Sequence, residues 1–256
     1  MRVNVLGVEI DKVTKDQAVE QILKWLRSGG RHFVVTPNIE FVMEAQNDRE
    51  FRAILNKASL AVPDSARFGW AIYRQTCSNF VLRLISWPLF LLPRLFDFPV
   101  TTGTDLMEEL IDRSADQGLT VGFLGGDDEV ALKLVERLKK RYPKLKVGLA
   151  ESHVTVNRQG EVVEGQGLLD KQELPLDLLF VAFGQVKQEK WIYKNLSKFP
   201  AKVMIGVGGA FDYLSGRVPR APKIVRDLGF EWLYRVVLQP WRLKRFRALV
   251  KFACLV

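Results

Sequence analysis

The stretch from residue 180 to residue 212 constrains the fold more than any other part of the sequence. Two short apolar runs, at residues 178–183 and 203–207, are rich in β-branched and aromatic residues, and a glycine follows each. Runs of this length and composition are typical of strands that are buried on both faces. The polar segment between them, residues 187–199, predicts a helix. The sequence therefore predicts a strand–helix–strand crossover, the unit of a parallel sheet.

Glycine and polar residues follow both of these predicted strands. Open α/β sheets bind ligands beyond the carboxyl ends of their strands. The residues at this position are Gly184, Gln185, Lys187, Gln188, Gly208, Gly209 and Asp212. They form either a ligand site or two ordinary glycine turns, because the sequence lacks the G-x-G-x-x-G fingerprint that would decide between the two.

Strand-like and helix-like segments alternate along most of the chain. The alternation runs through residues 3–207 without an internal repeat and stops after Asp212, and residues 3–8 are a first strand or half of a hairpin. We therefore predict an α/β fold with a mostly parallel, doubly wound, Rossmann-like sheet and helices on both faces. Residues 1–216 would form this domain, and residues 217–256 a helical C-terminal appendage.

The composition is that of a globular protein without disulfides. Of the 256 residues, 48% are hydrophobic and 26% are charged, and no uncharged apolar run is long enough to span a bilayer. The N-terminus lacks a signal-peptide pattern, so we expect a cytoplasmic protein. Cys77 and Cys254 are too few for a disulfide scaffold, and His32 and His153 lack the spacing of metal ligands. We expect reduced cysteines, no metal and no cofactor.

The positive charge is concentrated in the predicted appendage. Residues 217–256 contain ten Lys and Arg and two Asp and Glu, a net charge of +8 out of the +9 of the chain. A basic segment of this kind suits nucleic acid, an anionic membrane surface or a phosphorylated substrate. Its aromatic residues lie among Leu and Val at helical spacing, and no nucleic-acid recognition pattern is present. We therefore expect no nucleic-acid partner.

Three further predicted strands end in polar or glycine residues. Thr36 and Asn38 follow the first and act either as turn and N-cap residues or as ligand contacts. Asp64 follows the second, where it either caps the next helix or serves as a carboxylate base. Gly125 and Gly126 follow the third, and glycines before a helix let a phosphate approach the backbone N–H groups.

Residues 82–99 differ in character from the rest of the chain. They contain three prolines, many large apolar side chains and little charge. The stretch is too short and too interrupted by proline to span a bilayer, yet too apolar for an ordinary exposed loop. It either packs against the core or contacts a membrane or a hydrophobic acceptor.

Short motifs in order along nearly the whole chain resemble those of a known enzyme family. They are Thr36-Pro37-Asn38, Val62-Pro63-Asp64, Thr102-Gly103-x-Asp105-Leu106, Phe123-Leu124-Gly125-Gly126, Gly184-x-x-Lys187-Gln188-Glu189-Lys190-Trp191, Gly206-Val207-Gly208-Gly209-x-Phe211-Asp212, and Arg220-Ala221-Pro222 with Glu231-Trp232-Leu233-Tyr234-Arg235 and Pro240-Trp241-Arg242. Each motif is weak alone, but together they are specific. The chain resembles the WecG/TagA/CpsF glycosyltransferases, glycosyltransferase family 26.

The resemblance implies an inverting, metal-independent transfer from a UDP-sugar to a GlcNAc carried on a polyprenyl diphosphate. The sugar implied is N-acetylmannosamine or its uronic acid, in cell-surface polysaccharide or teichoic acid synthesis. The enzyme would lie at the inner face of the plasma membrane, attached through the appendage. A non-catalytic sugar-nucleotide-binding protein is the alternative, and a homo-oligomer is left open.

The resemblance also implies roles for single residues. Asp64 matches the proposed general base, while Thr36, Asn38 and Gln188 match pocket residues. The arginines that it assigns to activity are Arg235, Arg242 and Arg245. The residues that it places at the sugar nucleotide are Gly125, Gly126, Gly184, Lys187, Gly208, Gly209 and Asp212.

Two features depart from the family pattern. Val100 stands where members usually carry an arginine, so Arg94 or Arg83 would have to replace the lost guanidinium. The segment between Asp64 and Gly103 is also longer than usual, and the apolar residues 82–99 account for the excess. These departures bear on the assignment of the acceptor more than on that of the donor.

Overall fold

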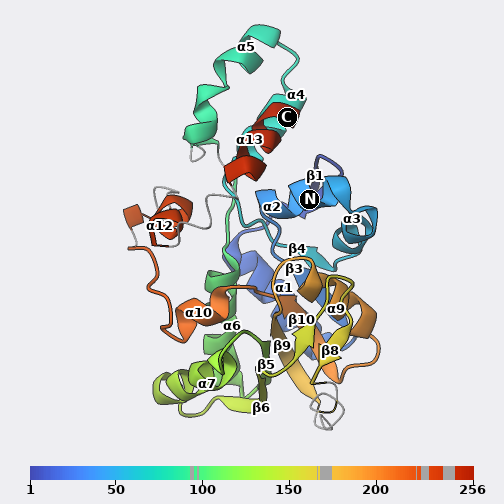
Figure 1. Ribbon diagram of the computed structural model, residues 1–256, viewed down its shortest axis with the longest axis vertical. Helices are drawn as coiled ribbons and strands as arrows, with labels where there is room; N and C mark the ends of the chain where they lie inside the picture. Colours follow the sequence, from blue (N-terminus) through green and yellow to red (C-terminus); the bar gives the residue numbers. More distant parts are fainter. Residues whose placement is uncertain are drawn as a thin grey trace.

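A parallel sheet forms the centre of the molecule (Figure 1). The computed structural model describes residues 1–92, 95–96, 98–165, 167, 175–222, 224–225, 231–238 and 246–256, with the backbone alone at residues 80, 83, 84, 231, 232, 235 and 238. The strands of the sheet, in spatial order, are β4 (Leu60–Ala61), β3 (His32–Val35), β10 (Ala201–Gly206), β9 (Leu176–Ala182), β5 (Thr120–Gly125) and β6 (Lys146–Glu151). Each neighbouring pair is parallel, which confirms the predicted α/β fold.

The central strands are buried on both faces because successive side chains of a strand point to opposite sides. In β9, Leu178 and Phe180 belong to one hydrophobic core, and Leu179 and Val181 belong to the core on the other face. This arrangement explains why the strand is an unbroken apolar run in the sequence.

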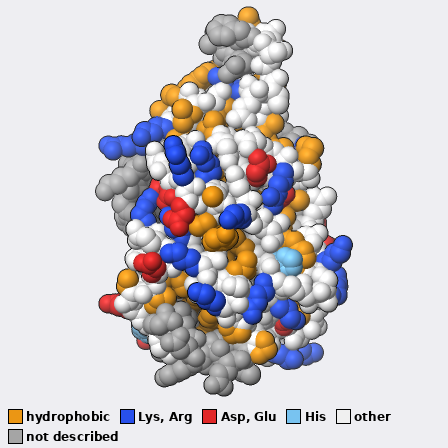
Figure 2. Space-filling view, turned by 90° about the vertical axis from the view of Figure 1, so that its right-hand side faces the viewer, with side chains coloured by type: hydrophobic (Ala, Val, Ile, Leu, Met, Phe, Trp, Pro, Cys, Tyr) orange, Lys and Arg blue, Asp and Glu red, His pale blue; other side chains and the backbone are white. Residues whose placement is uncertain are grey.

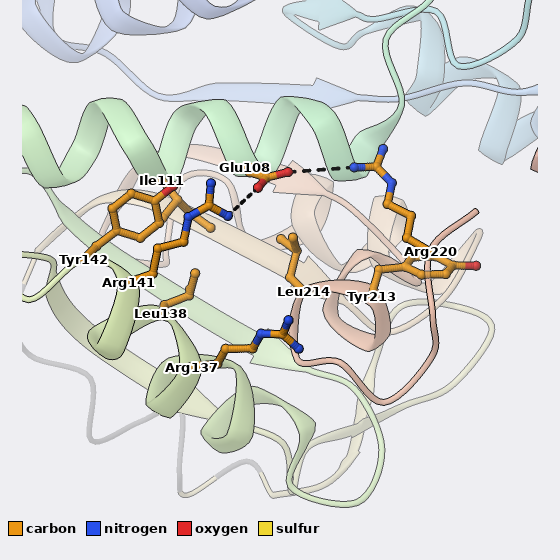
Figure 3. A pocket seen from close by; sticks show the side chains of 9 residues that line it. All are labelled: Glu108, Ile111, Arg137, Leu138, Arg141, Tyr142, Tyr213, Leu214 and Arg220. Carbon is orange, nitrogen blue, oxygen red and sulfur yellow. Dashed lines mark hydrogen bonds and ion pairs between the residues drawn. The ribbon is translucent and has the colours of Figure 1, made fainter. Parts of the chain in front are cut away.

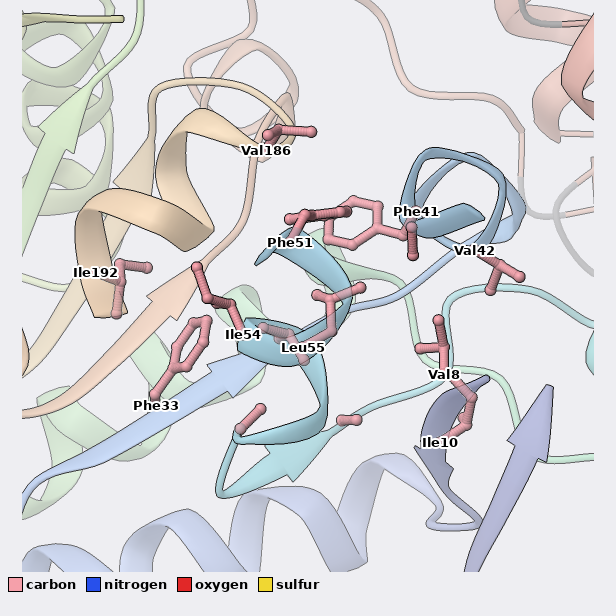
Figure 4. Close-up of a cluster of buried hydrophobic side chains, with 14 of the residues drawn as sticks. Val8, Ile10, Phe33, Phe41, Val42, Phe51, Ile54, Leu55, Val186 and Ile192 are labelled. Carbon is pink, nitrogen blue, oxygen red and sulfur yellow. The ribbon is translucent and has the colours of Figure 1, made fainter. Parts of the chain in front are cut away.

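Helices cover both faces of the sheet, as predicted. One core includes residues of α1 (Lys15–Ser28), α6 (Gly103–Gln117), α7 (Val130–Arg141) and α10 (Ala210–Leu214). The other includes residues of α2 (Ile39–Asn47), α3 (Arg49–Asn56) and α9 (Lys187–Asn195). Figure 4 shows this second core, where Phe51, Ile54 and Leu55 of α3 lie with Ile192 of α9 and Phe33 of β3. The crossover helix predicted for residues 187–199 thus forms and ends at Asn195.

Local signals in the sequence fix the helix ends. The Thr14 side chain accepts a hydrogen bond from the Gln17 N–H, and the Gln17 side chain accepts one from the Thr14 N–H, so α1 begins with a capping box. Thr102 caps α6 through the N–H of Asp105, and Gly118 ends that helix in the left-handed conformation. The cap at Thr102 fixes where α6 begins.

Two hairpins lie outside the main sheet. Residues 3–8 belong to the first, formed by β1 (Arg2–Val5) and β2 (Val8–Asp11), so the hairpin alternative is confirmed. The carboxylate of Asp11 accepts a hydrogen bond from the Ala61 N–H at 2.9 Å, which attaches this hairpin to β4. The second hairpin, β7 (Thr155–Val156) with β8 (Val162–Glu164), lies between β6 and β9 in the chain.

A helical lobe projects from one end of the molecule (Figure 1). It follows α4 (Arg67–Thr76) and contains α5 (Phe80–Ile85) and the 3-10 helix η1 (Pro88–Leu91). Residues 80–92 and 95–96 are termed the apolar lobe here. Phe90 is buried on its inner side, with its ring 4.9 Å from that of Trp70. The large side chains exposed on the lobe are Val81, Leu82, Ile85, Trp87, Leu91, Leu92 and Leu95.

The structure confirms core packing for some side chains of residues 82–99, and contact of the exposed ones with a membrane or a hydrophobic acceptor stays a prediction. Phe90 and Phe98 pack into the core, and Ser86 accepts a hydrogen bond from the Trp70 indole through its carbonyl at 2.8 Å. The exposed leucines leave more apolar surface in contact with solvent than an ordinary surface loop does. None of the helices in the described parts of the chain is long and apolar enough to cross a bilayer.

The C-terminal part of the chain returns to the main body. It contains α12 (Glu231–Leu238) and α13 (Phe246–Leu255). Phe252, Ala253 and Val256 are buried in the same core as α2 and α3. The division into residues 1–216 and 217–256 stays a prediction, but the last helix of the predicted appendage is packed on the domain.

Candidate functional site

Hydrogen bonds join the carboxyl ends of neighbouring strands into one edge. The Asp64 N–H, just past β4, donates to the Pro37 carbonyl, just past β3, at 2.8 Å. The Thr36 hydroxyl then donates to the Gly206 carbonyl of β10 at 3.3 Å. The Gly126 N–H, just past β5, donates to the Ala182 carbonyl of β9 at 3.0 Å. Residues that are far apart in the sequence are thus brought together where parallel sheets bind ligands. These joined carboxyl ends of β4, β3, β10, β9 and β5 are termed the shared edge.

Thr36 and Asn38 both serve the local structure. Thr36 is buried at 6% exposure, and its hydroxyl donates to the Gly206 carbonyl of β10. The Asn38 side-chain oxygen accepts a hydrogen bond from the Phe41 N–H at 3.1 Å and caps α2. The capping interpretation of Asn38 is therefore confirmed, and a contact between either residue and a ligand stays a prediction.

Asp64 does not cap the helix that follows it. Helix α4 begins after Ala66 and has no side-chain cap bond. The N–H of Arg67 donates to the Ser65 hydroxyl instead, at 3.3 Å. The capping interpretation of Asp64 is thus wrong, while its half-buried position just past β4 leaves the carboxylate at the shared edge.

The backbone conformations at two of the predicted glycine turns favour glycine. Gly126 has φ +83°, and a Cβ atom there would lie 2.1 Å from Val130. Gly184 has φ +87°, although a Cβ atom there would meet nothing within 4 Å. Both angles lie in the left-handed region that favours glycine. The N–H groups of Gly126 and Gly208 already donate to Ala182 and Gln188, so contact with a nucleotide through Gly125, Gly126, Gly184, Gly208 or Gly209 stays a prediction.

The beginning of α9 carries two buried polar side chains. Gln188 is 2% exposed, and its side-chain oxygen accepts a hydrogen bond from the Gly208 N–H at 3.2 Å. Glu189 is fully buried and accepts hydrogen bonds from the Val186 N–H and the Gln188 amide. Burial raises the pKa of Glu189 to about 7. We predicted no role for Glu189 from the sequence, although it stands three residues after Val186 at the spacing of a capping box.

Ion pairs hold the segment that follows α10. Arg217 lies 2.7 Å from the Asp128 carboxylate and 3.7 Å from that of Asp212. Arg220 donates to Asp105 at 2.6 Å and to the Thr102 hydroxyl at 3.3 Å. Arg220 therefore fastens this segment to the start of α6. The Arg-Ala-Pro motif was the signal for Arg220 in the sequence, but we predicted no role for it.

A cavity of about 180 Å³ lies between α6, α7 and α10 (Figure 3). Arg137 and Arg141 line it from α7, and Arg220 lines it from the loop after α10. Glu108 of α6 pairs with Arg141 at 2.7 Å and with Arg220 at 3.8 Å. The guanidinium groups at Glu108 are thus already neutralised in part by the protein itself.

Several predicted residues lie outside the part of the chain that the structure describes. These are Arg242, Arg245 and Arg94, together with the side chains of Arg235 and Arg83. Their roles stay predictions, as does that of Lys187 at the first position of α9. No three His, Cys, Asp or Glu side chains among the described residues are grouped so that they could hold a metal ion.

The parallel sheet with helices on both faces defines an α/β protein, and comparison with known proteins defines its class. The model of the "Glycosyl transferase WecG/TagA/CpsF family" matches residues 3–256, so the chain belongs to this family of glycosyltransferases. It is 31% identical over 253 residues to a protein of Staphylococcus aureus (strain MRSA252) named N-acetylglucosaminyldiphosphoundecaprenol N-acetyl-beta-D-mannosaminyltransferase. A protein of the same name from S. aureus (strain NCTC 8325 / PS 47) is 30% identical. Each match covers 98% of this chain and 90% of the relative.

Proposed function

We propose that this glycosyltransferase transfers N-acetylmannosamine, or its uronic acid, from a UDP-sugar to a GlcNAc carried on a polyprenyl diphosphate. The names of the two relatives support the sugar and the lipid-linked acceptor. The observation that carries the proposal is the position of Asp64, which follows β4 and is joined through its N–H to Pro37 at the carboxyl end of β3. The product would enter teichoic acid or another cell-surface polysaccharide.

In the proposed reaction, Asp64 acts as the general base. It removes the proton from the acceptor hydroxyl while that oxygen forms a bond to the anomeric carbon of the donor sugar. The bond between this carbon and the diphosphate oxygen breaks on the opposite face, so the configuration inverts and the electron pair leaves with UDP. The negative charge of the leaving group needs cations or oriented N–H groups. We assign this role to Arg235, Arg242 and Arg245, in place of a metal ion.

We further propose that the enzyme binds to the inner face of the plasma membrane, where a polyprenyl-linked acceptor would lie. The apolar lobe and one side of α13 support this. On α13, Phe246 and Val250 are exposed beside the exposed Arg247 and Lys251. Figure 2 shows hydrophobic side chains near the projecting end of the molecule, and Lys and Arg side chains spread over the face below it with Asp and Glu among them. Apolar insertion combined with about 1 kcal/mol per basic residue from anionic lipid is typical of interfacial binding.

The proposed function is tested by measuring UDP release with a panel of UDP-sugars and one synthetic lipid-linked GlcNAc acceptor. We expect release with UDP-N-acetylmannosamine or its uronic acid, and only when the acceptor is present. Binding of UDP-sugar without turnover would support the non-catalytic alternative. A salt-dependent shift of DNA or RNA in a gel would support nucleic-acid binding through the appendage.

A further inference from the structure

A chain of hydrogen bonds through Glu189 links the carboxyl ends of β9 and β10. The Val186 N–H donates to Glu189 Oε2 at 2.8 Å, and the Gln188 amide nitrogen donates to Glu189 Oε1 at 2.6 Å. The Gly208 N–H donates to the Gln188 oxygen at 3.2 Å. The hydroxyl of Thr36, just past β3, donates a hydrogen bond to the Gly206 carbonyl at the end of β10.

The direction of every hydrogen bond in this chain is determined by its two ends. Both ends are backbone N–H groups, which can only donate. The Gly208 N–H therefore requires the oxygen of the Gln188 amide, and the NH₂ group of that amide is left to face Glu189. The Val186 N–H occupies the other oxygen of Glu189. A carboxylate accepts with both oxygens and carries no O–H that needs an acceptor, so an ionised Glu189 satisfies the whole chain and fixes the orientation of the Gln188 amide.

The backbone around Glu189 leaves little room for another arrangement. Gly206 packs so closely that a Cβ atom there would lie 2.7 Å from Glu189 Oε1 and 2.8 Å from the Gln188 nitrogen. Val186 has a φ of 72°, which a β-branched residue rarely adopts. Strained residues of this kind persist where surrounding contacts hold them, and here one of those contacts is the bond from the Val186 N–H to Glu189.

Among the described residues, no cation contributes to the environment of Glu189, whose pKa is shifted by burial and by its own hydrogen bonds alone. The neighbouring charged groups mostly pair with one another: Lys190 pairs with Asp48 and Glu50, Lys194 pairs with Glu161, and Lys202 pairs with Asp177. The other charged or titratable side chains on the elements packed against α9, and on α9 itself, are His32, Arg49, Arg52, Lys187 and Tyr193. The carboxylate is thus held by N–H donors.

We propose that Glu189 is a positioning residue for sugar transfer, which fixes the Gln188 amide and, through it, the loop of residues 206–209 at the end of β10. This inference rests on the proposed function and on the family resemblance, which implies that Gln188 lies in the pocket and Gly208 at the sugar nucleotide. A proton on Oε1 of Glu189 makes that oxygen a donor that faces the Gln188 NH₂ group, so the amide has to rotate and the Gly208 N–H loses its acceptor. A proton on Oε2 faces the Val186 N–H instead. Transfer should therefore require the ionised form of Glu189.

The first test compares Glu189→Gln with Glu161→Gln. The Glu161 carboxylate is exposed and pairs with Lys194 of α9, the helix that contains Glu189. In Glu189→Gln, an NH₂ group faces either the Val186 N–H or the Gln188 NH₂ group, and one buried donor stays unsatisfied. We expect kcat/KM to fall by about 10–100-fold, as is typical for such a loss, while Glu161→Gln keeps wild-type activity. In the wild type, kcat/KM should rise as the pH increases through about 7, and Glu189→Gln should lack this rise.

The second test does not depend on activity or on the folding of a variant. In wild-type protein labelled with ¹⁵N-glycine, the Gly208 amide resonance should titrate with a midpoint near pH 7. A Gly208 resonance that does not change across this pH range would overturn the proposal, as would a Glu189→Gln variant with wild-type kcat/KM and an unchanged pH profile. If the wild type titrates as expected but transfers no sugar, the coupling between Glu189 and the loop of residues 206–209 stands, and the proposed function fails.

Discussion

At the scale of single residues, Asp64 carries the proposed chemistry. Replacing it with Asn keeps the size of the side chain but removes the base. We expect Asp64→Asn to lower kcat by about 10²–10⁴-fold, the usual contribution of a general base. UDP binding, measured by calorimetry, should stay near the wild-type value. Asp116→Asn, at an exposed position of α6, is the control, and wild-type turnover by Asp64→Asn would contradict the assignment.

Glu189 should also make the stability of the protein depend on pH. Burial raises its pKa from 4.5 to about 7. Between these two values the folded protein holds the proton that the unfolded chain has released, so the free energy of unfolding should fall as the pH rises. Urea unfolding at about pH 5 and about pH 8 should show this fall relative to Glu189→Gln, which has no proton to release. Equal pH dependence in the two proteins would show that the pKa of Glu189 in the folded protein is close to its ordinary value.

Residue types alone could not decide the roles of Asn38 and Asp64. Both follow a strand and precede a helix, and N-cap residues and ligand-binding residues are drawn from the same types. The structure separates them, because Asn38 caps α2 and Asp64 does not cap α4. Glu189 was harder to predict. Its burial depends on β10 and on Gly206, which are distant in the sequence.

At the scale of elements, the apolar lobe contains side chains with two different tasks. We expect Ile85→Ser and Leu91→Ser, both at exposed positions, to weaken binding to anionic vesicles by about tenfold each, because each removes apolar area that would be buried in lipid. Their thermal stability should stay near that of the wild type. Vesicle flotation measures the binding, and Leu132→Ser, at an exposed position of α7, is the control. Unchanged flotation of both lobe variants would exclude the lobe as a membrane contact.

Phe90 offers a contrasting variant within the same lobe. Its ring packs against Trp70, so Phe90→Ser should lower the free energy of unfolding by about 3 kcal/mol. Denaturant unfolding followed by tryptophan fluorescence would measure this loss. A stability close to that of the wild type would mean that Phe90 is not part of the core.

The crossover was predictable because a strand buried on both faces leaves a continuous apolar run, as β9 and β10 do. The interior of the lobe was not predictable in this way. Phe90 and Leu91 are adjacent and equally apolar, yet only Phe90 is buried. Which of the two faces inward depends on the position of Trp70 in α4, and no local pattern in the sequence contains this information.

At the scale of the whole molecule, the last helix connects the proposed membrane surface with the core. The end of the strand–helix alternation after Asp212 predicted an appendage at residues 217–256, and its last helix, α13, is docked beside α2. Deleting the appendage would therefore also uncover the core. Single substitutions on the two sides of α13 separate the two roles better than a truncation does.

Phe252 and Phe246 provide this matched pair on one helix. Phe252 is fully buried, whereas Phe246 is 47% exposed. We expect Phe252→Ala to lower the free energy of unfolding by about 3–5 kcal/mol, because it leaves a cavity beside α2. Phe246→Ala should change stability by about 0.5 kcal/mol or less but weaken vesicle binding, since its ring would enter the lipid interface. Urea unfolding and vesicle flotation of both variants measure the two effects. If Phe246→Ala floats like the wild type, the exposed side of α13 does not contact the membrane, and the apolar lobe alone would have to account for membrane binding.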